Sequence, residues 1–207
     1  MPPKGNNMSH EESQEIKPVV QKLIFGYDTE TCGIPNWKIP SDDPSQPHLV
    51  QLAAQLVNAE TREVVDSMDV IIKPDGWEIP QETIDIHGIT MEMAEKEGIP
   101  EQEALEMFLA MRGDHERVAY NKTFDQRIVR IACKRYLSEE AMEKWAVKED
   151  HHCSMMMAKK SMGVKSVKLV DAYKHFKGVE MEGNHNAMAD TKACLDVYFG
   201  VIDSQEV

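Results

Sequence analysis

The chain has 207 residues, of which 42% are hydrophobic, so it is long enough to bury a substantial core. Its formal net charge of −13 argues against a protein that coats long nucleic acids electrostatically, but not against an enzyme that handles one strand end through bound cations. The four cysteines form no Cys-x-x-Cys pair and no apolar run approaches the ~18 residues of a membrane span, so we expect a reduced, cytoplasmic protein with no membrane partner.

The first half of the chain predicts strands. Residues 1–18 lack periodic apolar positions and are predicted to be a flexible leader, which leaves 19–207 as a single domain. A strand is expected near 21–30, followed by a Pro-rich segment at 34–47 that is long enough to be a functional loop. The runs HLVQLAAQLVNAE and REVVDSMDVIIKP predict two more strands joined at 58–61, which gives an antiparallel three-strand meander.

The second half is mostly helical. Thr90 is expected to cap a short helix that ends at Gly98, and Pro100 to occupy the first position of a helix that ends at Gly113. ERVAYN predicts a fourth strand and TFDQRIVRIACKRY an amphipathic helix, and further helices are expected at 139–146, 155–162, 167–177 and 186–203. This order predicts an α/β fold with a mixed central sheet flanked by helices.

The first strand ends in a pair of acids. In FGYDTETCG, Asp28 and Glu30 alternate along the strand, so both carboxylates point to the same face. Two neighbouring anions repel each other, and one of them would protonate unless a cation lies between them. The pair therefore predicts a metal site, or else a water-exposed strand end.

Three residues of the helical half carry further signals. Asp190 shares a helix face with small and apolar residues, so a buried carboxylate is expected there that needs a cation or hydrogen-bond donors. Asp125 lies in the first turn of its helix, where electrostatics of the helix start are a sufficient explanation when it is taken alone. His185 lies just before the last helix and is either a surface residue or a catalytic base, since imidazole titrates near neutrality.

Together these segments resemble the DEDDh branch of the 3′-to-5′ exonuclease superfamily, which has a ribonuclease H-like fold. The D-x-E motif matches Asp28 and Glu30, and the N-x-x-F-D motif matches NKTFD, which ends at Asp125. The H-x-x-x-x-D motif matches HNAMAD, from His185 to Asp190, and the resemblance spans about residues 22–203. Each motif alone is weak, but three in the right order form a specific signal.

The resemblance implies a mechanism. Asp28, Glu30 and Asp190 would bind two Mg²⁺ or Mn²⁺ ions ~3.5–4 Å apart, with Asp125 completing the site, in part through water. His185 would be the general base, and nucleoside 5′-monophosphates would leave from the 3′ end. The substrate contacts implied in the same way are five: Thr31, Cys32, His87, Asn121 and Phe124.

Other features leave alternatives open. Cys32 stands where the family often has Thr, and Trp37 in the Pro-rich loop either stacks on a base or pins the loop to the domain. Six lysines between 159 and 177, against the single acid Asp171, form either a phosphate track or a solvated helix face. HHC at 151–153 lacks the spaced pairs of a zinc site.

The expected substrate is the 3′ end of single-stranded DNA. The alternatives are an RNA-trimming exoribonuclease of the same family and a non-catalytic module that binds nucleic acid or a polymerase. Sequence alone does not decide between a deoxyribose and a ribose substrate.

Overall fold

The computed structural model describes residues 21–205, so the predicted leader at 1–18 lies outside the described part of the chain. Five strands in these residues form one mixed sheet in the order β3-β2-β1-β4-β5. They are β1 (Leu23–Thr31), β2 (Leu49–Asn58), β3 (Val64–Ile71), β4 (Glu116–Ala119) and β5 (His151–Cys153). The pairs β1–β2 and β2–β3 are antiparallel, which confirms the predicted meander, whereas β1–β4 and β4–β5 are parallel.

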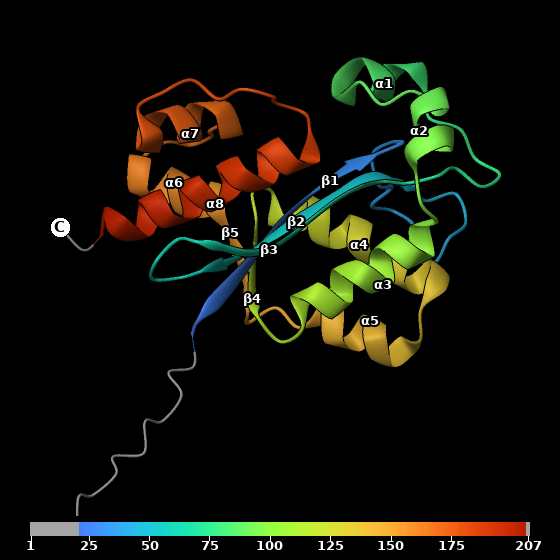
Figure 1. The fold of residues 1–207 in the computed structure, drawn as a ribbon, viewed down its shortest axis with the longest axis horizontal. Helices are drawn as coiled ribbons and strands as arrows, with labels where there is room; N and C mark the ends of the chain where they lie inside the picture. Colours follow the sequence, from blue (N-terminus) through green and yellow to red (C-terminus); the bar gives the residue numbers. More distant parts are fainter. Residues whose placement is uncertain (1–20, 206–207) are drawn as a thin grey trace, which may run out of the picture.

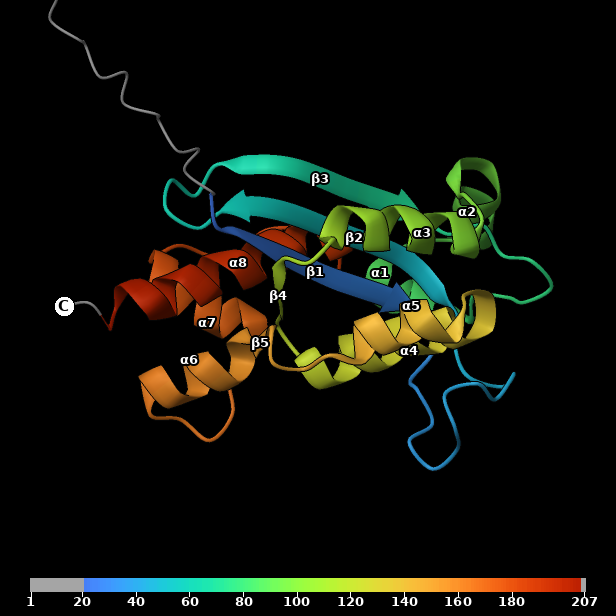
Figure 2. The same ribbon diagram turned by 90° about the horizontal axis from the view of Figure 1, so that it is seen from below.

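Eight helices in the described residues flank this sheet. They are α1 (Gln81–His87), α2 (Met91–Glu97), α3 (Glu101–Arg112), α4 (Lys122–Tyr136), α5 (Glu139–Ala146), α6 (Ser154–Met162), α7 (Leu169–Lys177) and α8 (Ala187–Asp203). Helices α6, α7 and α8 gather on one side and α3, α4 and α5 on the other, with α1 and α2 near one end of the sheet (Figures 1 and 2). The predicted α/β fold with a mixed, helix-flanked sheet is confirmed.

Both faces of β1 are covered. Phe25 and Tyr27 point toward α3, where Phe25 meets Phe108 edge-on at 5.0 Å between ring centroids. On the opposite face Gly26 lets α8 approach, because a Cβ at this position would lie 2.4 Å from Cγ of Leu195. The last helix therefore packs directly onto the strand that carries the paired acids.

The structure corrects three details of the predicted elements. Helix α1 adds to the predicted elements; it has seven residues and none of them is buried, so no buried face marks it in the sequence. Strand β5 was also missed, since its three residues, HHC, are polar and their pairing is decided by β4. Pro100 is the N-cap of α3 rather than its first helical residue, while Thr90 caps α2 through a bond from the Met93 amide, as predicted.

Within residues 21–205, no helix combines the length and the hydropathy needed to cross a membrane.

Candidate active site

Strand alternation places the first two acids beside α8. Asp28 and Glu30 have the same parity as Gly26, so they face the last helix, whereas Tyr27 and Thr29 face the opposite layer. Both acids lie near the carboxyl end of β1, opposite Ala53 and Gln51 of β2. Each side chain is half-buried, so the pair lies at the wall of a cleft.

The beginning of α8 is fixed against the sheet. The Ala187 amide donates to Oε1 of Gln51 at 3.1 Å, and the side chain of Asn186 caps the helix by accepting from the Ala189 amide. This anchoring holds Asp190, in the first turn, next to β1. The side chain of Asp190 is 8% exposed, and its Oδ1 is buried without a hydrogen-bond partner in the described structure. A buried carboxylate oxygen without a donor is the feature that a bound cation would satisfy.

Three of the predicted residues converge. Glu30, His185 and Asp190 each offer a ligand atom, and these atoms lie within 4.8 Å of one another. His185 is exposed and has a left-handed backbone, with φ of 67°, in the turn before α8. That turn brings the exposed imidazole close to the carboxylates of Glu30 and Asp190.

Asp125 reaches the same cleft from the other layer. It is in the first turn of α4, which starts directly after β4, the parallel neighbour of β1. Its side chain is only 3% exposed, and Oδ1 accepts a hydrogen bond from Thr29 Oγ1 at 2.9 Å. Helix-start electrostatics alone do not explain a buried carboxylate that a strand residue holds in place, so Asp125 belongs with the other acids.

Burial raises the pKa of all four carboxylates, and repulsion by neighbouring acids adds to the rise at Asp28, Glu30 and Asp125. Burial, together with the charges of Asp190 and Asp125, raises the pKa of Glu30 to about 8. Burial raises the pKa of Asp125 to about 7 and of Asp190 to about 6, and burial and the three other acids raise the pKa of Asp28. An all-oxygen set of crowded acids with one imidazole at its edge fits hard divalent cations such as Mg²⁺ or Mn²⁺.

A cleft of about 590 Å³ opens over these acids. It is lined by all five residues of the predicted catalytic set and by Asn121 and Phe124, two of the predicted substrate contacts. Its far wall includes Tyr120 and Lys168, which the motifs did not indicate. Tyr120 donates to the Val167 carbonyl at 2.9 Å, which places Lys168 at the cleft.

The other predicted substrate contacts lie outside the lining of this cleft. Thr31 Oγ1 donates to the Gly33 carbonyl at 2.7 Å, and Cys32 Sγ accepts from the His48 amide at 3.1 Å. Cys32 packs against the apolar cluster that includes Ile89, near His87 at the end of α1. His87 Nδ1 accepts from the Ile89 amide, and burial lowers the pKa of this imidazole.

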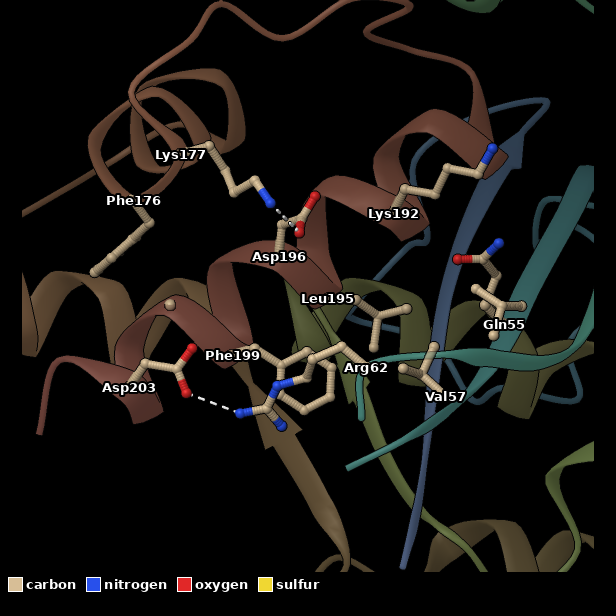
Figure 3. Close-up of a pocket in the computed structure, with 12 residues that line it drawn as sticks. Gln55, Val57, Arg62, Phe176, Lys177, Lys192, Leu195, Asp196, Phe199 and Asp203 are labelled. Atoms are coloured by element: carbon tan, nitrogen blue, oxygen red, sulfur yellow. Dashed lines mark hydrogen bonds and ion pairs between the residues drawn. The ribbon is translucent and has the colours of Figure 1, made fainter. Parts of the chain in front are cut away.

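A second hollow, of about 500 Å³, lies along α8 beside the β2–β3 hairpin (Figure 3). Its acids are paired: Arg62 bonds Asp203 at 2.8 Å and Lys177 bonds Asp196 at 2.9 Å. It therefore lacks the crowded, unpaired carboxylates of the first cleft. The Lys177 pair also divides the predicted lysine track, since Lys168 lines the cleft while Lys177 is held on the back of α8.

The HHC segment at 151–153, whose spacing argues against a zinc site, uses its side chains in other contacts. His151 hydrogen-bonds Tyr27 Oη at 3.1 Å, and His152 pairs with Glu116 at 3.0 Å. Cys153 Sγ instead donates to the Tyr120 carbonyl. The three side chains thus serve three separate partners.

Comparisons with known proteins bear on the family and the fold of this chain. A family model described as an exonuclease matches residues 25–198. Escherichia coli exonuclease I in complex with a dT13 oligonucleotide superposes with a TM-score of 0.71 at 20% identity, over 90% of this chain and 42% of that chain. Exonuclease I from Methylocaldum szegediense gives a TM-score of 0.70 at 20% identity, over 89% of this chain and 41% of that chain. The nuclease domain of 3′hExo, a DEDDh family member bound to rAMP, gives a TM-score of 0.63 at 14% identity, over 90% and 94%.

The chain thus spans about two fifths of the length of the exonuclease I chains that it resembles. No curated protein matches its sequence. The structural similarity confirms the predicted ribonuclease H-like fold and the resemblance to a DEDDh nuclease domain. Because the family model covers most of the sequence, the chain belongs to the exonuclease family of hydrolases.

Proposed function

We propose that this protein is a divalent-metal-dependent 3′-to-5′ exonuclease that acts on single-stranded DNA and releases nucleoside 5′-monophosphates. The observation that carries the proposal is the convergence of Glu30, His185 and Asp190 within 4.8 Å, in a cleft that Asp28 and Asp125 also line. The catalytic unit is taken to be residues 19–207, with the site built from β1, α4 and α8.

Each residue has a role that follows from its place. Asp28, Glu30 and Asp190 would hold two Mg²⁺ or Mn²⁺ ions, and Asp125, oriented by Thr29, would complete the site. When bound, the ions lower the pKa of water toward neutrality and offset negative charge on the leaving 3′ oxygen. His185 lies at the exposed mouth of the site, where it accepts the proton of the attacking water and passes it to solvent.

The cleft walls would hold the last nucleotide. Phe124 and Leu169 offer apolar surface to the base and sugar, and Asn121 and Lys168 offer donors to the sugar and phosphate. Thr31, Cys32 and His87 lie outside the lining of this cleft, and their contacts with the nucleic acid stay a prediction.

An RNA-trimming activity is the second candidate. It is favoured by the match to 3′hExo, which was solved with rAMP and of which this chain covers 94%. A non-catalytic module that binds nucleic acid or a polymerase is disfavoured, because all five acid and base positions of the motif set are present in one cleft.

The test is a gel assay with 5′-labelled DNA and RNA single strands of the same sequence, in Mg²⁺, Mn²⁺ or EDTA. We expect a ladder that shortens from the 3′ end, that EDTA abolishes, and that Asp28→Ala reduces at least a hundredfold. Asp196→Asn, an acid on the back of α8, is the matched control and should keep wild-type activity. A folded, metal-supplied protein that degrades neither strand would support the binding-module alternative instead.

A further inference from the structure

The Pro-rich loop at 34–47 presents an aromatic side chain to solvent. Trp37 is 54% exposed, and Ile34 on the same loop is 81% exposed. A tryptophan that mainly pinned the loop to the domain would be largely buried, so the exposure of Trp37 favours the stacking alternative. The loop is held by other residues.

Those other residues make the loop rigid. Gln46 is 2% exposed, and its side chain accepts from the Asn36 amide at 3.0 Å and donates to the carbonyls of Asn36 and Pro40 at 3.0 and 2.9 Å. Asn36 Oδ1 accepts from the Lys38 amide, so the backbone on both sides of Trp37 is fixed. The exposed indole is therefore positioned in advance rather than left free on a flexible turn.

Helix α4 connects the loop to the active-site cleft. Arg127 donates to the Ile39 carbonyl at 2.7 Å, and its guanidinium lies 5.7 Å from the centre of the Trp37 ring. Phe124, which lines the cleft, is three residues before Arg127 and so shares its side of the helix, ~4.5 Å away along the axis. Helix α4 thus links Phe124 at the cleft to Arg127 beside Trp37, and both views show the loop beside α4 (Figures 1 and 2).

The charges near Trp37 are mixed. Helix α4 carries five basic residues and one acid, and one of the basic residues, Arg127, lies beside Trp37. Arg135 is paired with Glu101, and the loop also carries Asp42 and Asp43. Lys38, next to Trp37, is exposed, and its ammonium forms no ion pair within residues 21–205. An exposed indole beside a free ammonium is the combination with which proteins bind single strands, by stacking on a base and contacting a phosphate.

We propose that Trp37 and Lys38 form a stacking platform for the single strand as it leaves the cleft toward its 5′ end. The proposal rests on the exonuclease function proposed above and adds a second contact site to it. Neither residue touches the reacting atoms, so the platform acts on strand binding and not on bond cleavage. Strands too short to extend from the cleft to the loop do not reach it.

The test compares the KM and kcat of wild type and Trp37→Ala on a twelve-nucleotide single strand and on a dinucleotide. We expect Trp37→Ala to raise the KM for the long strand about tenfold, with unchanged kcat and an unchanged KM for the dinucleotide. Trp37→Tyr, which keeps an aromatic ring, should have a KM for the long strand close to that of wild type. Val65→Ala, at an equally exposed position on β3, is the control and should alter neither substrate.

An unchanged KM for the long strand in Trp37→Ala would overturn the platform, as would an equal rise for both substrates. Failure of Trp37→Tyr to restore binding would also overturn it. These results are distinguishable from failure of the proposed function, in which the wild type itself degrades neither substrate in Mg²⁺ or Mn²⁺. In that case both proposals fall together.

Discussion

Removing one acid from the site should stabilise the metal-free protein. In Asp190→Asn the buried side chain keeps its size and loses its charge. In the wild type, Oδ1 of this carboxylate is buried without a hydrogen-bond partner in the described structure. Burial raises the pKa of Asp190 from 3.8 to about 6, which corresponds to a destabilisation of about 3 kcal/mol once the group is ionised. The variant also relieves Glu30, whose pKa Asp190 helps to raise. Partial solvent access reduces the net gain, so we expect 1–3 kcal/mol, or a rise in Tm of about 3–10 °C.

The sign of the pH dependence follows from the direction of the shift. The folded protein holds the Asp190 proton more tightly than the unfolded chain does, so stability falls as the pH rises from about 4 through about 6 and stays low above that. In EDTA the Tm of Asp190→Asn should exceed that of wild type at pH 7.5, and the difference should vanish near pH 4.

Adding Mn²⁺ at pH 7.5 should raise the Tm of wild type above that of Asp190→Asn, because the bound cation strongly stabilises only the folded wild type. Asp196→Asn is the control on the same helix: it loses the surface pair with Lys177 and should gain no stability in EDTA. Equal melting temperatures of wild type and Asp190→Asn in EDTA at pH 7.5 would refute the picture of a repulsive acid cluster. So would a wild type whose Tm does not respond to Mn²⁺.

Three further variants test how the site is held. Thr29→Ala should raise the pKa of Asp125 and move the acid limb of the kcat/KM profile to higher pH, while Thr29→Ser should keep the wild-type profile. Gly26→Ala should lower the stability by about 1–3 kcal/mol, because its Cβ would overlap Leu195, and the added change Leu195→Ala should recover part of the Tm. Lys168→Ala should reduce the slope of log KM against log salt by about one, and an unchanged slope would remove it from the phosphate contacts.

The predictable part of the site is the part that follows from periodicity. Strand alternation puts Asp28 and Glu30 on one face, and the apolar stripe around Asp190 marks a buried acid, so both could be read from sequence. Asp125 could not be interpreted on its own, since its burial depends on Thr29, 96 residues earlier in the chain. Spatial pairing of that kind has no local sequence signal.

The unpredicted elements also lack a local sequence signal, for two different reasons. Strand β5 exists because β4 supplies its hydrogen-bond partners, and helix α1 is a short helix with no buried residue. The lysine segment at 159–177 shows another limit of prediction from sequence. Its lysines are alike in sequence, but the structure places them in different surroundings. Lys168 lines the cleft, while Lys174 and Lys177 are paired with Glu180 and Asp196. Local charge counts therefore do not reveal which cations remain free.

The electrostatics of the chain explain why a stacking contact suits this site. A protein of net charge −13, with four carboxylates at its proposed reaction centre, repels a phosphate strand unless cations intervene. Ions bound by the acids would reverse the charge at the scissile phosphate but not along the rest of the strand. Base stacking is independent of net charge, so an exposed Trp37 adds affinity where the protein's overall charge works against phosphate contacts. On this reasoning, strand binding should depend less on salt than it does in a basic protein, and the metal ions and the indole should hold separate parts of the strand.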